Sequence, residues 1–98
     1  MEIIKTQNGT ELDLALEGRL DTTTAPQLEA VISTELGGIS ALTMDFSKLE
    51  YISSAGLRVL LAAQKTMSKQ GKMVIHGANS DVMEVFEITG FSDILTIE

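Results

Sequence analysis

Two serines separate a short apolar segment from a helical pattern in the stretch Tyr51-Ile52-Ser53-Ser54-Ala55-Gly56-Leu57-Arg58-Val59-Leu60-Leu61. Leu57, Leu60 and Leu61 recur at the i, i+3, i+4 spacing that gives a helix one buried face. Serine is a preferred N-cap because its side-chain oxygen accepts a hydrogen bond from a free N–H of the first turn. We therefore predict a helix that begins at the serines, runs to about Gln70, and is ended by Gly71 in a left-handed conformation.

A hydroxyl group at a helix N-terminus has a second interpretation besides capping. Free N–H groups and the positive end of the helix dipole favour an anion there, so a phosphate attached to a serine would be well placed. The position of Ser53 and Ser54 alone does not distinguish a cap from a phosphoacceptor. Both interpretations stay open at this point.

Composition limits the classes of function. The 98 residues predict one domain, 1–98, without a linker, and the absence of cysteine excludes disulfides and thiolate metal sites and is compatible with a reducing cytoplasm. No apolar run reaches the roughly 18 residues of a membrane span, and residues 1–5 lack a signal peptide's apolar region. A net charge of −7 argues against direct nucleic-acid binding and fits a partner with a basic surface. We expect a cytoplasmic protein.

The strand pattern begins with a hairpin. Asn8-Gly9 is a strong turn signal, and Leu12, Leu14 and Leu16 alternate with polar residues until Gly18, which is predicted to end the strand. A third strand is predicted over Ala41 to Phe46, followed by a loop over residues 47–52. Two further strands are predicted: Lys72 to His76, buried on both faces, and Ile94 to Ile97.

Two more helices complete the pattern. One follows Pro26 and is closed by Gly37-Gly38, and the other is capped within Asn79-Ser80-Asp81 and stopped by Gly90. The order ββαβαβαβ predicts a single α/β domain with an N-terminal β-hairpin followed by βαβαβαβ. Its sheet is mixed, with helices packed on it, because strands joined by helical crossovers run parallel.

Ligands of such sheets bind beyond the carboxyl ends of the parallel strands. Asp21, the pair Ser53 and Ser54, and the segment 77–80 follow three strands and are expected at one edge, although Asp21 is also an ordinary turn or cap residue. Arg58, with Lys65 and Lys69 further along the helix, forms either a solvated face or a surface for an acidic partner.

Enzyme signatures are missing. The elbow G-x-S-x-G is absent because Ile52 stands at its first glycine, and no G-x-x-x-x-G-K phosphate loop occurs. His76, the one histidine, is expected to be structural or surface-exposed rather than a general base. We therefore predict no catalytic residue, no metal and no cofactor.

The segment Tyr51 to Leu57, preceded by Asp45-Phe46-Ser47 and by Gly18-Arg19-Leu20-Asp21, resembles the anti-sigma factor antagonists of the STAS domain family over nearly the whole chain. In that family the serine two places before the glycine is phosphorylated by a partner kinase. The resemblance implies that Ser54 is the phosphoacceptor, with Ser53, where the family most often has Asp, as the second candidate.

The resemblance further implies a STAS-like domain that works by partner switching. The unphosphorylated protein, a monomer when free, would bind an anti-sigma factor and release a sigma factor. That anti-sigma factor, a histidine-kinase-like serine kinase, would phosphorylate Ser54 and break the complex, and a PPM-type serine phosphatase would reset it. The partner-binding residues implied are Asp21, Ser53, Ser54, Ala55, Gly56 and Arg58.

Two alternatives remain open. One is a STAS module of another assembly, either a stressosome-like scaffold or a soluble component of a lipid transport system. The other is an enzyme or small-ligand carrier that uses the same edge of the sheet.

Overall fold

The sheet has four strands in the order β1-β2-β3-β4. A computed structural model of the chain describes residues 1–98. The elements are β1 (Glu2–Asn8), β2 (Glu11–Leu20), α1 (Ala25–Glu35), β3 (Ala41–Ile52), α2 (Ser54–Gln70), β4 (Lys72–His76), α3 (Ser80–Thr89) and the 3₁₀ helix η1 (Phe91–Asp93). β1 and β2 form the predicted antiparallel hairpin, and β2, β3 and β4 are parallel neighbours, as helical crossovers require.

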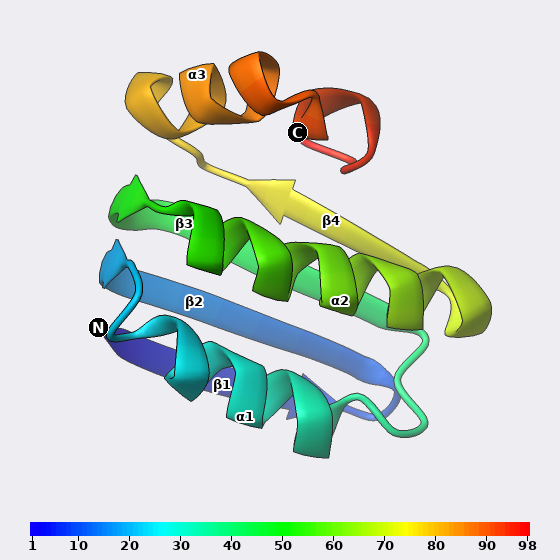
Figure 1. Ribbon diagram of the computed structural model, residues 1–98. Helices are drawn as coiled ribbons and strands as arrows, with labels where there is room; N and C mark the ends of the chain where they lie inside the picture. Colours follow the sequence, from blue (N-terminus) through cyan, green and yellow to red (C-terminus); the bar gives the residue numbers. More distant parts are fainter.

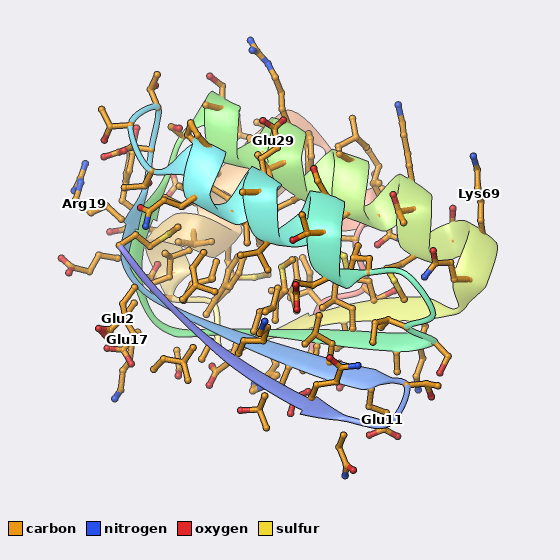
Figure 2. The ribbon with its side chains drawn as sticks, turned by 90° about the horizontal axis from the view of Figure 1, so that it is seen from below. Glu2, Glu11, Glu17, Arg19, Glu29 and Lys69 are labelled. Atoms are coloured by element: carbon orange, nitrogen blue, oxygen red, sulfur yellow. The ribbon has the colours of Figure 1, made fainter.

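The helices cover one face of the sheet. α1 and α2 lie side by side on that face (Figure 1), and Figure 2, which shows the sheet nearly edge-on, has both of them on one side of it. Leu12, Leu14 and Leu16 of β2 are fully buried under the helices, which confirms the predicted alternation. α3 joins the same core, because its Phe86 packs against Phe46 of β3 with ring centroids 6.4 Å apart.

Strands β2 and β3 are both longer than predicted. β2 continues through Gly18 to Leu20, and the predicted loop over residues 47–52 is instead the second half of β3, paired with Glu17 to Leu20. The register shifts between Ala15 and Glu17 and again between Gly18 and Arg19. These irregularities break the period of two, and the polar residues of this half strand face solvent, so the pattern looked like a loop.

Two predictions about the last strands are wrong. β4 is not buried on both faces: Met73 and Ile75 are buried under the helices, whereas Lys72 and His76 are exposed on the uncovered face. Residues 94–97 form no strand, and Ile97 makes only an isolated bridge to Ile75. The N–H groups of Ile94 and Leu95 donate hydrogen bonds to the carbonyl oxygen of Phe91 in η1, at 3.0 and 2.8 Å, so only the residues after Leu95 are left to pair with Ile75.

Glycines end α2 and α3 at the predicted residues. Gly90 ends α3 with a φ of 81°, the left-handed conformation. Gly71 ends α2 for a different reason from the one predicted, because its φ of 171° is not left-handed. A Cβ at Gly71 would lie 1.8 Å from the carbonyl oxygen of Ser40, so this position needs glycine for close approach of two backbones.

Candidate functional site

The parallel pairing of β2 and β3 brings two distant motifs together. Leu20 pairs with Ile52 at the ends of the strands, and the N–H of Ser53 donates a hydrogen bond of 2.9 Å to the carbonyl oxygen of Leu20. Asp21 and the two serines therefore leave the sheet side by side. We call Asp21, Ser53, Ser54 and Ala55 the serine rim.

The two serines have different environments. Ser53 is the N-cap of α2: its side chain accepts a hydrogen bond from the N–H of Gly56 at 3.5 Å, and its carbonyl oxygen accepts one from Leu57 at 3.0 Å. Ser54 is the first residue of α2, is exposed, and its hydroxyl forms no hydrogen bond within the chain. The structure thus gives the capping role to Ser53 and leaves Ser54 free.

The first turn of α2 has no negative charge of its own. It contains no acidic residue, and the N–H groups of Ser54 and Ala55 donate no hydrogen bond within the chain. The N–H groups and the dipole of this 17-residue helix therefore offer a favourable environment to an anion next to the Ser54 hydroxyl.

Gly56 allows α2 to pack directly on the strand ends. It is buried, and a Cβ there would lie 2.7 Å from Cγ of Leu20 and 3.0 Å from Cγ1 of Ile52. The sequence suggested a partner-binding residue; the structure shows a buried packing position that supports the half-buried Ala55 and the exposed Ser54 next to it.

Asp21 organises the turn before α1. One carboxylate oxygen, Oδ1, accepts hydrogen bonds from the N–H of Thr23 at 3.0 Å, the N–H of Thr24 at 3.1 Å and the hydroxyl of Thr23 at 2.8 Å. The Thr23 hydroxyl and these N–H groups hold the pKa of Asp21 below its ordinary value. Asp21 therefore has the turn role that its sequence context suggests, and it lies on the serine rim as well.

Arg19 is a residue that sequence reasoning missed. Its guanidinium lies over the Tyr51 ring, 4.3 Å from the centroid, and its Nε is 3.9 Å from Oδ2 of Asp21. Figure 2 shows Arg19 at the end of the molecule where β2 finishes. The signal in the sequence is its place in Gly18-Arg19-Leu20-Asp21, two residues before Asp21.

Arg58 lies one turn after Ser54 and is exposed without an ion pair. It lines a shallow cavity of about 180 Å³ between α1 and α2, together with Glu29 of α1. Lys65 and Lys69 are also exposed, and Figure 2 shows Lys69 at the end of α2 far from Arg19. Of the three basic residues of α2, only Arg58 is close to the serine rim.

The loop after β4 brings α3 to the same end of the sheet. A Cβ at Gly77 would lie 3.0 Å from the backbone of Ser47, and Asn79 Nδ2 donates to the carbonyl oxygen of Leu49 at 3.1 Å. Asn79 also caps α3, because its Oδ1 accepts a hydrogen bond of 2.8 Å from the N–H of Val82. Residues 77–80 thus contact the second half of β3, at Ser47 and Leu49, rather than Asp21 or the two serines.

His76 is separated from the serines by the sheet. It pairs in register with Asp45 and lines a cavity on the uncovered face with Thr6 and Asp13, whereas α2 lies on the other face. The N–H of Ser47, at 2.9 Å, is the main reason that the pKa of Asp45 lies below its ordinary value. His76 is therefore not positioned to act as a general base for Ser54.

No group of three histidine, cysteine or carboxylate side chains in the chain could hold a metal ion. None of its helices is both long enough and apolar enough to cross a membrane.

Comparison with known proteins identifies the family. The STAS domain model matches residues 2–98, so the chain belongs to the STAS domain family. It is 40% identical over 84 residues, 84% of the chain and 72% of the relative, to the putative anti-sigma factor antagonist BtrV of Bordetella bronchiseptica. It is 32% identical to the anti-sigma-B factor antagonist of Listeria monocytogenes, over 97% of the chain and 85% of the relative.

Solved structures show the same fold. The anti-sigma factor antagonist SpoIIAA in its unphosphorylated form superimposes with a TM-score of 0.78 and 19% identity, over 99% of this chain and 87% of that one. The Bacillus cell fate determinant SpoIIAA in the phosphorylated form gives a TM-score of 0.77 and 19% identity, over 99% and 91%. The predicted STAS-like α/β fold is confirmed, apart from the corrections to its strands.

Proposed function

We propose that this protein is an anti-sigma factor antagonist whose binding is controlled by phosphorylation of Ser54. The unphosphorylated form binds an anti-sigma factor kinase and frees a sigma factor. The observation that carries the proposal is the division of roles at the start of α2, where Ser53 caps the helix and the exposed Ser54 hydroxyl has no partner in the chain. Relatives named anti-sigma factor antagonists, one of them 40% identical, support it.

Phosphorylation at Ser54 is compatible with the fold. A phosphate adds about −1.5 to −2 charges and three strong acceptor oxygens at neutral pH. The free N–H groups of the first turn and the helix dipole accept that charge, and Arg58 lies four residues further on, the spacing at which side chains meet on one face of a helix. We therefore expect the phosphorylated protein to stay folded.

The same phosphate disrupts binding. Ser54 is exposed on the serine rim, so a partner that covers this rim has to desolvate the dianion or place it near acidic groups. A loss of about 3 kcal/mol of binding free energy weakens a complex by more than a hundredfold. A modification that leaves the fold intact can therefore release the bound partner.

The proposed cycle needs two partner proteins and no catalytic residue of this chain. The anti-sigma factor supplies the kinase activity, and a PPM-type serine phosphatase restores the hydroxyl. Both partners and the sigma factor would act in the cytoplasm, where transcription takes place. The chain itself acts as a binding protein, and we expect it to be a monomer when free.

The test follows the complex during phosphorylation. The purified protein is mixed with each histidine-kinase-like anti-sigma factor encoded in the source genome, first with ADP and then with ATP, and complex formation is measured by analytical size exclusion. We expect one such factor to bind in ADP and to release the wild-type protein in ATP, while a Ser54→Ala variant stays bound in both. Binding that ATP does not affect would favour the scaffold or lipid-transport alternative.

A further inference from the structure

A groove lies between the end of β3 and α3, next to the serine rim. Ile52, Val82 and Val85 form its apolar inner surface, with Tyr51 and Ile88 at its sides, and its volume is about 320 Å³. Figure 1 shows why it forms: α3 begins at the end of the sheet where β3 finishes. We call this cavity the α3 groove.

The sides of the α3 groove are unusually exposed apolar residues. Ile88 is 76% exposed and Tyr51 is 40% exposed. A single exposed apolar side chain on a protein surface needs no explanation. Two that face one apolar cavity are typical of a surface that a partner covers.

The groove also has an acidic margin. Asp81 and Glu84 line it from α3, three residues apart and thus on one face of the helix. Neither carboxylate forms an ion pair in the structure. The charge and shape together fit an apolar side chain flanked by a lysine or arginine.

The groove lies beside the serine rim, because its lining residue Ile52 adjoins the rim in the chain. Ile52 directly precedes Ser53, and Tyr51 carries the Arg19 guanidinium, which reaches toward Asp21. A protein that covers the Ser54 hydroxyl therefore has the groove within the same contact area. An apolar side chain of that partner would be buried in the groove, while a neighbouring basic side chain of the partner contacts Asp81 and Glu84.

We propose that the α3 groove is the second half of the partner surface, and that the kinase which phosphorylates Ser54 inserts into it an apolar side chain adjacent to a basic one. This inference rests on the proposed function and adds the docking contact. The groove contributes the same contact in both states of Ser54, and the state of Ser54 decides whether that contact is sufficient to keep the complex together.

Two matched pairs of variants test the groove. Ile88→Ser removes an apolar wall, and its control Ile94→Ser removes an isoleucine that is 48% exposed and lies outside the groove. Glu84→Lys reverses a charge at the margin, and its control Glu87→Lys makes the same change on α3 outside the groove. All four positions are exposed, and melting temperatures check that the variants are folded.

The probe is each histidine-kinase-like anti-sigma factor of the source genome, purified singly. We expect Ile88→Ser and Glu84→Lys to weaken the binding of one of them by about tenfold or more, as for residues at the centre of an interface, and each control to change it by less than about twofold. With ATP, the KM for phosphorylation of Ser54 should rise in the groove variants while kcat is unchanged, because docking is lost and the reacting serine is intact.

The outcomes separate the two proposals. If Ser54→Asp abolishes binding but Ile88→Ser and Glu84→Lys bind as wild type does, the groove inference is overturned and the proposed function stands. If no such kinase binds or phosphorylates the wild-type protein, the proposed function fails, and the groove inference fails with it. Equal losses in the groove variants and in their controls would also overturn the groove inference.

Discussion

The N-termini of α2 and α3 begin with the same arrangement of residues and differ in how it is completed. Each helix has a polar cap followed by a serine at its first position: Ser53 and Ser54 in α2, Asn79 and Ser80 in α3. In α3 the cap forms a hydrogen bond of 2.8 Å to the third N–H of the helix, whereas in α2 the equivalent distance is 3.5 Å.

The first turns of α2 and α3 also differ in charge and in packing. The first turn of α3 contains Asp81, which supplies a negative charge to the helix dipole, whereas the first turn of α2 contains no acidic residue. The third position is a buried valine, Val82, in α3 and a buried glycine, Gly56, in α2, where the strand ends come too close for a Cβ. The start of α3 is stabilised from within the chain, and that of α2 leaves room for an added anion.

The largest expected effect concerns the two serines at the first helical positions. Ser54→Asp should weaken anti-sigma factor binding by roughly a hundredfold, because it adds a charge on the partner surface. Ser80→Asp adds the same charge at the matching position of α3 and should change affinity by less than about threefold. Isothermal titration calorimetry measures both. Equal losses would show that net charge, and not the position of Ser54, controls binding.

A second difference concerns the third helical position. Gly56→Val should lower the free energy of unfolding by about 1–3 kcal/mol, because the new side chain overlaps with Leu20 and Ile52. It should also weaken partner binding by displacing the first turn of α2. Urea denaturation measures the stability. The control is Gly37→Val, where an added Cβ would have no atom within 4 Å; comparable losses at both glycines would contradict the packing role.

The caps themselves give a smaller effect. Asn79→Ala should cost about 1–2 kcal/mol of unfolding free energy, since it removes the cap and the bond to the Leu49 carbonyl. Ser53→Ala should cost about 0.5–1 kcal/mol because its hydrogen bond is longer, and Ser54→Ala should cost close to nothing. A larger loss for Ser54→Ala than for Ser53→Ala in urea denaturation would reverse the assignment of the cap.

The smallest effect is the pH dependence of the turn before α1, which the carboxylate of Asp21 organises. The pKa of Asp21 is lowered by folding, so its ionised form stabilises the native state at pH values above the unfolded pKa, near 4. That contribution is lost as the pH falls below 4 through the folded pKa. Asp21→Asn should therefore flatten the decrease of melting temperature between about pH 5 and 2. An unchanged slope would mean that the Thr23 and Thr24 contacts do not act on the carboxylate.

The sequence predicts those parts of the molecule that depend on local chemistry. The turn at Asn8-Gly9, the alternation of Leu12 to Leu16, and the helix end at Gly90 follow from backbone preferences and burial. Gly71 ends α2 at the predicted residue, but through a close approach to the Ser40 carbonyl that the sequence does not show. The second half of β3 was missed because its pairing with β2 depends on register shifts that no residue pattern shows. The strand predicted over Ile94 to Ile97 is wrong because the N–H groups of Ile94 and Leu95 bond to Phe91 of η1, a turn that the apolar pattern does not show.

The sequence identifies the segment that forms the candidate site, but it does not show how the side chains of that site are arranged in space. The pair Ser53 and Ser54 is visible in the sequence, but both residues are able to cap a helix, and only the direction of each hydroxyl separates their roles. Arg19 and the α3 groove depend on contacts between elements far apart in the chain. Tyr51 meets Arg19 through the pairing of β2 and β3, and Ile88 meets Tyr51 through the packing of α3.

Mapping the phosphorylated residue tests the role of Ser54 most directly. The wild-type protein is incubated with its anti-sigma factor kinase and ATP, and the modified peptide is sequenced by tandem mass spectrometry, with Ser53→Ala and Ser54→Ala treated in parallel. We predict one phosphate, on Ser54, in the wild type and in Ser53→Ala, and none in Ser54→Ala. Phosphate on Ser53 or Ser80, or phosphorylation that survives in Ser54→Ala, would contradict it.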